Sequence, residues 1–144
     1  MKIDDIMSMW GEDHPIDETE LGVESGRVPN LHAKYLKELT AEKYNLGRMK
    51  YQQKRLKRVL YEYYSGDLND PESLEEIDRE PWMKKVLKNE LDVYIDSDND
   101  MIEMNLKVVM QEEKVNYLDS VMRHLNNRGY LIRQMIDWAK FTHG

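Results

Sequence analysis

Lysine, arginine and tyrosine residues gather in segment 43–61, and their types and spacing suit recognition of a polyanion. Helical positions at offsets 0, 7, 11, 14 and 18 lie on one face, and this segment fills them with four lysines and one tyrosine. Ammonium and guanidinium groups neutralise phosphates, and an aromatic ring offers a stacking surface to an unpaired base. The pattern therefore predicts binding of single-stranded nucleic acid. The candidate residues are Lys43, Lys50, Lys54, Lys57 and Tyr61, with Arg58 at the edge of the face and Arg55 as a further cation.

The same residues have a plainer interpretation. Lysine and arginine are good helix formers, and a charged helix face is often only solvated. The cations could instead pair with acidic segments of the same chain or of a neighbouring subunit, and Tyr63 and Tyr64 are expected to be packing residues. A membrane-surface helix is less favoured, because the apolar side of this helix is typical of a protein seam. A helical scaffold, whose basic helix serves subunit packing, is therefore the alternative function.

The charges of the chain are arranged in blocks. The 144 residues carry a net charge of −7, yet residues 31–66 hold nine Lys or Arg against three Glu. Residues 1–30 hold eight acids against two cations, and residues 67–105 hold thirteen acids against four cations. The basic segment thus lies between two acidic ones, and this arrangement says more about partners than the mean charge does.

Motifs for catalysis and for metal or nucleotide binding are missing. The sequence has no phosphate-binding GxxxxGK[ST], no GxGxxG, no HExxH and no cysteine. Residues 96–100 begin like a calcium loop, but such a loop needs Gly at its sixth position and Glu at its twelfth, where Met101 and Lys107 stand. The acids are better explained as an N-cap, with Asp100 and Glu103 as a capping box. We therefore expect a protein that is not an enzyme and has no cofactor or metal.

The apolar pattern predicts an all-α fold of elongated helices with bundle or coiled-coil packing. Across residues 31–66, apolar residues recur at spacings of 7, 3, 7, 4 and 3, and Gly66 suits the cap that ends a helix. The polar residues Glu42 and Gln53 occupy the two vacant positions of this stripe. The stripe consists of Leu39, Leu46, Met49, Leu56, Leu60 and Tyr63.

The C-terminal segment carries two adjacent apolar stripes, which need neighbours on both sides. We therefore expect a homo-oligomer that assembles through this segment, with a kink or tight turn at residues 126–129. The second stripe includes Ile102, Leu106 and Val109. The expected oligomerisation residues are Met101, Met104, Val108, Val115, Leu118, Met122, Leu125, Leu131, Met135 and Trp138.

A single helical domain over residues 1–144 is expected, in four parts. Residues 1–30 contain several Gly and Pro and form an acidic arm of short helices; residues 31–66 form the basic DNA-binding helix. Residues 67–99 form an acidic connector with a short helix at 81–92, and residues 100–144 form the oligomerisation helices. The absence of cysteine, of a signal-type N-terminus and of a long apolar run favours a reducing cytoplasm and no membrane.

The chain resembles the UvsY family of phage recombination mediators over nearly its whole length, and four stretches carry the resemblance. They are KIDDIMSMWGEDHPIDETEL at the start, VPNLHAKYLKEL, the RLKRVLYEYYSG end of the basic helix, and NNRGYLIRQMIDWAKFTHG at the C-terminus. The resemblance implies an all-helical protein without enzymatic activity that forms rings of six or seven subunits and binds single-stranded DNA.

The resemblance also implies partners and a motif. Proteins of this kind help a RecA-like recombinase displace single-strand DNA-binding protein in recombination, repair and recombination-dependent replication, here in the cytoplasm of an infected bacterial host. The family's DNA-binding motif, Leu-Lys-Ala-Arg-Leu, corresponds to residues 56–60, where Lys57 matches. The arginine comes one position early, as Arg58, with Val59 in its place. This shift turns the guanidinium about 100 degrees around the helix.

Overall fold

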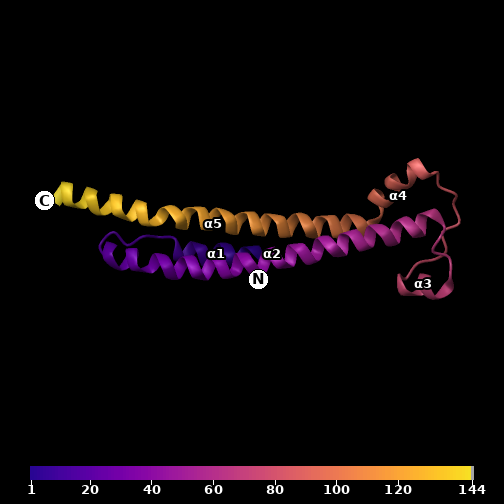
Figure 1. Ribbon diagram of the computed structural model, residues 1–144, viewed down its shortest axis with the longest axis horizontal. Helices are drawn as coiled ribbons and strands as arrows, with labels where there is room; N and C mark the ends of the chain where they lie inside the picture. The colour runs from indigo at the N-terminus through magenta and orange to yellow at the C-terminus, as the bar shows by residue number, and fades with distance from the viewer. Residues whose placement is uncertain (144) are drawn as a thin grey trace. The chain divides into compact units, whose positions relative to one another are not determined.

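The computed structural model describes residues 1–143, which contain helices and no strand, and so confirms the all-α prediction (Figure 1). Among these residues, none of the helices combines the length and apolar character needed to cross a bilayer. The helices are α1 (Ile3–Asp13), α2 (Leu21–Ser65), α3 (Pro71–Glu76), the 3-10 helix η1 (Lys88–Glu90), α4 (Leu91–Ser97) and α5 (Asn99–His143).

The chain divides into two compact units, and α2 and α5 each contribute to both of them. Unit 1 consists of residues 1–44 and 112–144, and unit 2 of residues 45–111. The four-part division that the sequence suggests follows chain order. The compact units instead combine segments that are far apart in the chain.

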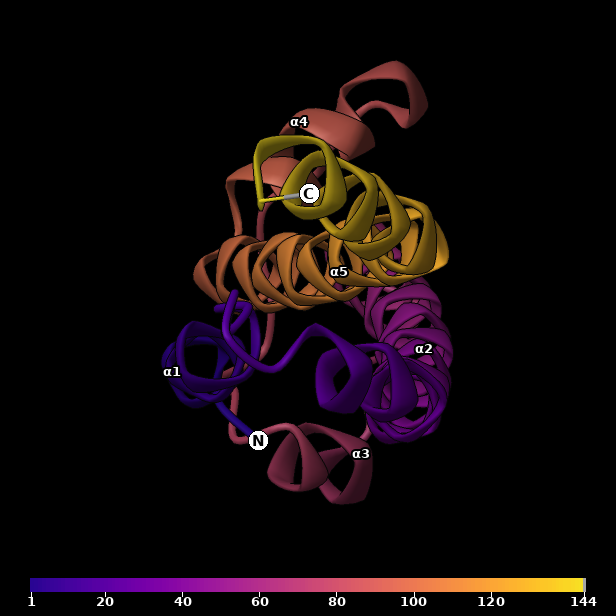
Figure 2. The same cartoon turned by 90° about the vertical axis from the view of Figure 1, so that its left-hand side faces the viewer.

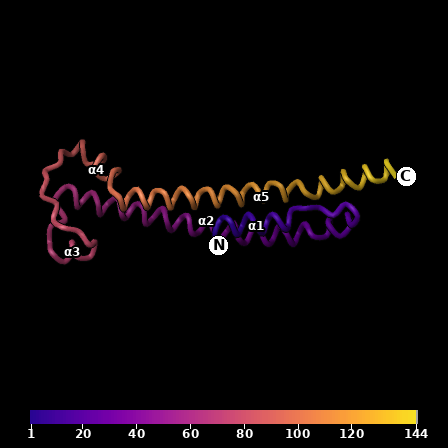
Figure 3. Tube along the Cα trace, turned by 180° about the vertical axis from the view of Figure 1, so that it is seen from behind, coloured from indigo at the N-terminus to yellow at the C-terminus, as the bar shows by residue number. Residues whose placement is uncertain are grey.

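Unit 1 is a three-helix assembly in which α1 lies beside α2 and α5, and the C-terminal end of α5 extends beyond α1 (Figures 2 and 3). The ring of Trp10 on α1 contacts Tyr35 of α2 and His124 of α5 at centroid distances of 5.2 Å each. Apolar residues of all three helices are buried, including Ile6, Leu39 and Leu118. α1 is therefore part of a core and is not a free arm.

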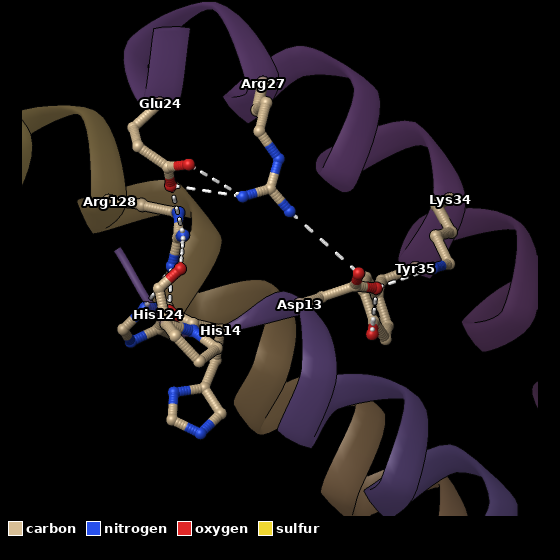
Figure 4. A network of polar contacts seen from close by, with 9 residues as sticks. Asp13, His14, Glu24, Arg27, Lys34, Tyr35, His124 and Arg128 are labelled. Atoms are coloured by element: carbon tan, nitrogen blue, oxygen red, sulfur yellow. Dashed lines mark hydrogen bonds and ion pairs between the residues drawn. The ribbon is translucent and has the colours of Figure 1, made fainter. Parts of the chain in front are cut away.

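A polar network joins the three helices of unit 1 (Figure 4). Arg128 of α5 is fully buried, and its Nη1 donates to the carbonyl of His14 at 2.9 Å, while its Nη2 lies 3.3 Å from Glu24 Oε2. Arg27 donates to Glu24 Oε1 at 2.9 Å and lies 4.0 Å from Asp13. This chain of charges links the end of α1 to α2 and α5, so it closes unit 1 with buried ions rather than apolar contacts alone.

The predicted arm of short helices at residues 1–30 is only partly correct. α1 is one short helix of the expected kind, but α2 already begins at Leu21 and continues through Gly26 and Pro29. A proline inside a helix costs about 3 kcal/mol. The flanking turns offset this cost because Glu24 is held by Arg128 on one side of Pro29 and Leu31 is buried on the other.

The predicted tight turn at residues 126–129 is wrong, because α5 is helical throughout Asn99–His143. Asn and Gly are weak helix formers, and a helical glycine costs about 1 kcal/mol relative to alanine. Burial of Leu125, Arg128 and Ile132, at spacings of three and four, anchors this stretch of helix to the core. Tertiary contacts therefore override the local sequence signal.

Unit 2 closes around an apolar cluster of α2, α3, α4 and α5. The cluster contains Leu60, Tyr63, Tyr64, Leu74, Leu91, Ile95 and Met101. The expected helix at 81–92 is wrong: residues 81–87 are irregular, and helical structure begins only with η1 and α4. Trp82 of this irregular segment packs edge-on against Tyr64, with 4.7 Å between the ring centroids. This contact fixes the segment to the cluster although the segment is not helical.

We expect Arg128→Ala to destabilise the protein by about 1.5–3 kcal/mol, because it leaves the buried Glu24 carboxylate with Arg27 alone and removes the donor to the His14 carbonyl. Chemical unfolding followed by circular dichroism at one protein concentration measures this loss. Arg133→Ala, at an exposed position of the same helix, is the matched control and should change stability by less than about 0.5 kcal/mol. Equal stability of the two variants would contradict the role of the network.

Candidate nucleic-acid interface

The part of α2 in unit 2 has one buried side and one exposed side. Leu60, Tyr63 and Tyr64 are buried in the apolar cluster, and Leu56 packs against it, which confirms the two tyrosines as packing residues. Gln53 donates to Asn105 of α5 at 2.7 Å, so the polar position in the stripe is satisfied across the helix pair. Gly66, with φ of +87°, ends α2 in a conformation that side-chain-bearing residues rarely adopt.

The predicted DNA-binding residues of unit 2 lie on the exposed side of α2 and are all solvent-exposed. They are Lys50, Lys54, Arg55, Lys57, Arg58 and Tyr61. Arg58 lies 4.0 Å from Glu62 one turn later, an exposed pair that contributes little. Within residues 1–143, no ion pair engages Arg55 or Lys57. These two cations are therefore available to an external anion.

Lys43, the first residue of the predicted face, lies in unit 1. Its ammonium is 3.8 Å from Asp119 of α5, and both side chains are more than a third exposed. Nearby Glu42 is buried and lies 3.5 Å from Lys114. Lys43 thus takes part in the polar contacts of unit 1, and its inclusion in a nucleic-acid face is the least supported of the seven residues.

Sequence reasoning missed Tyr51 as a candidate site residue. Its side chain is 74% exposed, and the Lys54 ammonium lies 5.6 Å from the centre of its ring. A tyrosine three residues before a lysine and four before an arginine is a sequence signal that could have indicated it. The interface therefore presents two exposed tyrosines, Tyr51 and Tyr61, among its cations.

A carboxylate at the start of α5 holds the end of α2 in place. Asp98 accepts hydrogen bonds from Tyr64 Oη at 2.6 Å and from both Nη atoms of Arg79 at 2.6 and 2.8 Å. Its Oδ1 also accepts from the backbone N–H of Asp100 at 2.9 Å. Asp98, rather than the predicted pair of Asp100 and Glu103, therefore caps α5.

The environment of Asp98 changes its acidity. Burial raises the pKa of this carboxyl group, but the hydrogen bonds from Arg79 and Tyr64 outweigh burial and bring the pKa to about 2. The group therefore remains ionised at all physiological pH values. Its charge keeps Tyr64 and Arg79 in position behind the basic face.

The structure corrects six of the ten predicted oligomerisation residues. Met104, Leu131, Met135 and Trp138 keep exposed or partly exposed surface. The other six have exposed fractions between 0 and 8%, so they form the core of the subunit itself and offer no surface to a second copy. These six are Met101, Val108, Val115, Leu118, Met122 and Leu125.

Comparisons with known proteins show the family of the chain and its fold. The model of the family described as "Recombination, repair and ssDNA binding protein UvsY" matches residues 9–144. No curated protein matches the chain. Crystal structures of the bacteriophage T4 recombination mediator protein UvsY share its fold: lattice type II at 22% identity and a TM-score of 0.84, covering 100% of this chain and 99% of that one. Lattice type IV aligns at 20% identity and a TM-score of 0.85, covering 98% and 99% of the two chains.

We expect acid to destabilise the protein in a window set by Asp98. Because folding lowers the pKa of this group from its ordinary 3.8 to about 2, its stabilisation is complete above pH 4 and is lost as the pH falls to about 2. In urea unfolding, the wild type should lose about 2 kcal/mol more than Asp98→Asn between pH 5 and pH 2.

Asp96→Asn, at an exposed carboxylate two residues earlier, provides the control and should keep the wild-type pH dependence. Parallel pH profiles for the wild type and Asp98→Asn would contradict the role of Asp98.

Proposed function

The chain belongs to the UvsY family of recombination, repair and single-stranded-DNA-binding proteins, and we propose that it binds single-stranded DNA as a recombination mediator. In this role it loads a RecA-like recombinase onto DNA coated by single-strand DNA-binding protein, in the cytoplasm of an infected bacterium. It serves phage recombination, repair and recombination-dependent replication. The observation that carries the proposal is a row of exposed cations on α2, in a protein with a net charge of −7. The row consists of Lys50, Lys54, Arg55, Lys57 and Arg58.

Binding by this row is electrostatic. Each lysine or arginine that meets a phosphate releases a counterion, so affinity falls steeply as salt rises. The row holds no set of Asn, Gln and Arg side chains arranged to read base edges, which suits a protein that accepts any sequence. A mediator needs this tolerance because recombination can begin at any position of a genome.

Assembly into a hexameric or heptameric ring lets weak binding by each subunit add up to stable binding of one DNA strand. A ring repeats the row in every subunit, and contacts along one strand then add up through a high effective concentration. On α5 in unit 2, three apolar residues of one stripe remain exposed by 42–64%: Ile102, Leu106 and Val109. Apolar surface of this kind marks protein contacts, and we assign the contact between subunits to this stripe.

The alternative, a scaffold whose basic helix pairs with acidic segments of neighbouring subunits, is favoured by one observation. Lys43 and Arg58 both lie within 4.0 Å of a carboxylate of the same chain, so cations of α2 do take acidic partners. The two functions predict different effects of rising salt concentration. A scaffold of this kind dissociates as salt rises, whereas the proposed mediator releases DNA and keeps its apolar subunit contacts.

We expect Lys54→Ala combined with Lys57→Ala to weaken binding of an oligo(dT) at least tenfold at low salt, with oligomer mass unchanged. Because each phosphate contact to a single strand contributes about 0.7 to the slope of log affinity against log salt, the slope should become about 1.4 shallower per subunit engaged. Fluorescence anisotropy across a salt series, with light scattering on the same samples, measures both.

Lys85→Ala combined with Lys88→Ala, which removes two exposed lysines of unit 2 outside α2, is the matched control. This variant should keep the wild-type affinity and slope. An unchanged slope in the α2 variant would refute the proposed face, and wild-type protein that fails to bind while dissociating with salt would favour the scaffold.

We expect Leu106→Glu combined with Val109→Glu to lower the molar mass of the assembly, because two charges per subunit would be buried at the proposed contact. Light scattering measures the mass, and circular dichroism should show unchanged helix content. Val93→Glu, at a 64% exposed apolar position of α4, provides the control and should keep the mass. Wild-type mass in the double variant would place the contact elsewhere.

A further inference from the structure

Tyr51 is the most exposed tyrosine in residues 1–143, although it belongs to the same helix as the buried Tyr63 and Tyr64. A ring that is 74% exposed contributes little to folding, so the packing of the subunit does not explain it. It lies within the basic part of α2, where six cations occur between residues 48 and 58.

Tyr51 belongs to a second row on α2, distinct from the lysine row. The lysine row consists of Lys50, Lys54 and Lys57. The second row consists of Arg48, Tyr51, Arg55 and Arg58, all of them exposed. Three members of the second row follow a lysine by one residue, which places them about 100 degrees around the helix from it. One side of the helix thus presents ammonium groups, and the neighbouring side presents guanidinium groups with an aromatic ring.

The two rows suit different parts of a single strand. An ammonium group is a compact charge that suits a phosphate. Guanidinium and tyrosine rings are planar, and both stack on the faces of unpaired bases. The Lys54 ammonium, 5.6 Å from the centre of the Tyr51 ring, brings the two rows together at one point. A phosphate at Lys54 would place the base of the same nucleotide within reach of Tyr51.

We propose that Tyr51 is a base-stacking residue, that the arginine–tyrosine row contacts the bases, and that the lysine row holds the phosphates. This inference rests on the proposed function and adds the origin of its selectivity. In a duplex the base faces are stacked on one another and unavailable, so only unpaired DNA gains the contact with Tyr51. The cations alone would bind both forms through their phosphates.

The test compares Tyr51→Leu and Tyr51→Phe with wild type on two ligands of equal length, an oligo(dT) and an abasic deoxyribose-phosphate oligomer. Wild type should bind oligo(dT) more tightly than the abasic strand. Tyr51→Leu should lose at least fivefold in affinity for oligo(dT), with abasic binding and the salt slope unchanged. Tyr51→Phe keeps the ring and should behave as wild type. Tyr130→Leu, at a 67% exposed tyrosine of α5, is the matched control and should also behave as wild type.

The outcomes separate this inference from the proposed function. If Tyr51→Leu binds oligo(dT) as wild type does, or if Tyr51→Phe loses as much affinity as Tyr51→Leu, stacking by Tyr51 is overturned while binding by the cations stands. A changed oligomer mass in Tyr51→Leu would assign the ring to a subunit contact and would also overturn it. If wild type binds neither ligand, the proposed function and this inference fall together.

Discussion

The carboxylate of Asp98 is the constraint on which the candidate interface depends. It accepts hydrogen bonds from Tyr64 and Arg79, and it caps the first turn of α5. The donor–acceptor distances of 2.6–2.8 Å leave these two side chains little freedom to move. Because Tyr64 is fixed, the last turns of α2 cannot rotate within unit 2, and the side opposite Tyr64 must face solvent. That side carries Tyr51, Arg55 and Arg58, so their exposure is a consequence of the buried Asp98 carboxylate on the other side of the helix.

Cations of this protein fall into two groups with different partners. Arg79 and Arg128 are held by carboxylates with little or no exposure, and they stabilise unit 2 and unit 1 respectively. The cations of α2 between residues 48 and 58 are exposed, whereas several carboxylates of the chain pair with other cations: Asp98 with Arg79, Glu24 with Arg27 and Arg128, and Asp13 with Lys34. An acidic chain can thus keep a local positive surface, because its buried acids are already paired.

Sequence patterns predicted what depends on neighbours along a helix and failed where distant contacts decide. The stripe from Leu39 to Tyr63 and the stop at Gly66 were predictable because side-chain spacing and backbone freedom are local properties. Helix continuation through Pro29 and Gly129 was not, because it depends on Arg128, which contacts residues more than a hundred positions away. The prediction of which apolar stripe of α5 contacts a second subunit failed for the same reason. Both are apolar, and only the fold shows that Val108 is buried while Leu106 is exposed.

The position of Arg58 connects the interface to the family that the chain belongs to. In the motif that residues 56–60 resemble, the arginine stands where this chain has Val59, which is partly buried. An arginine one residue earlier is turned about 100 degrees, onto the row of Tyr51 and Arg55. That row is exposed and already holds a planar ring, so the displaced guanidinium gains a neighbour with the same stacking chemistry. In the proposed interface, the departure from the motif therefore places this arginine toward the bases, and it leaves Lys57 in the lysine row that we assign to the phosphates.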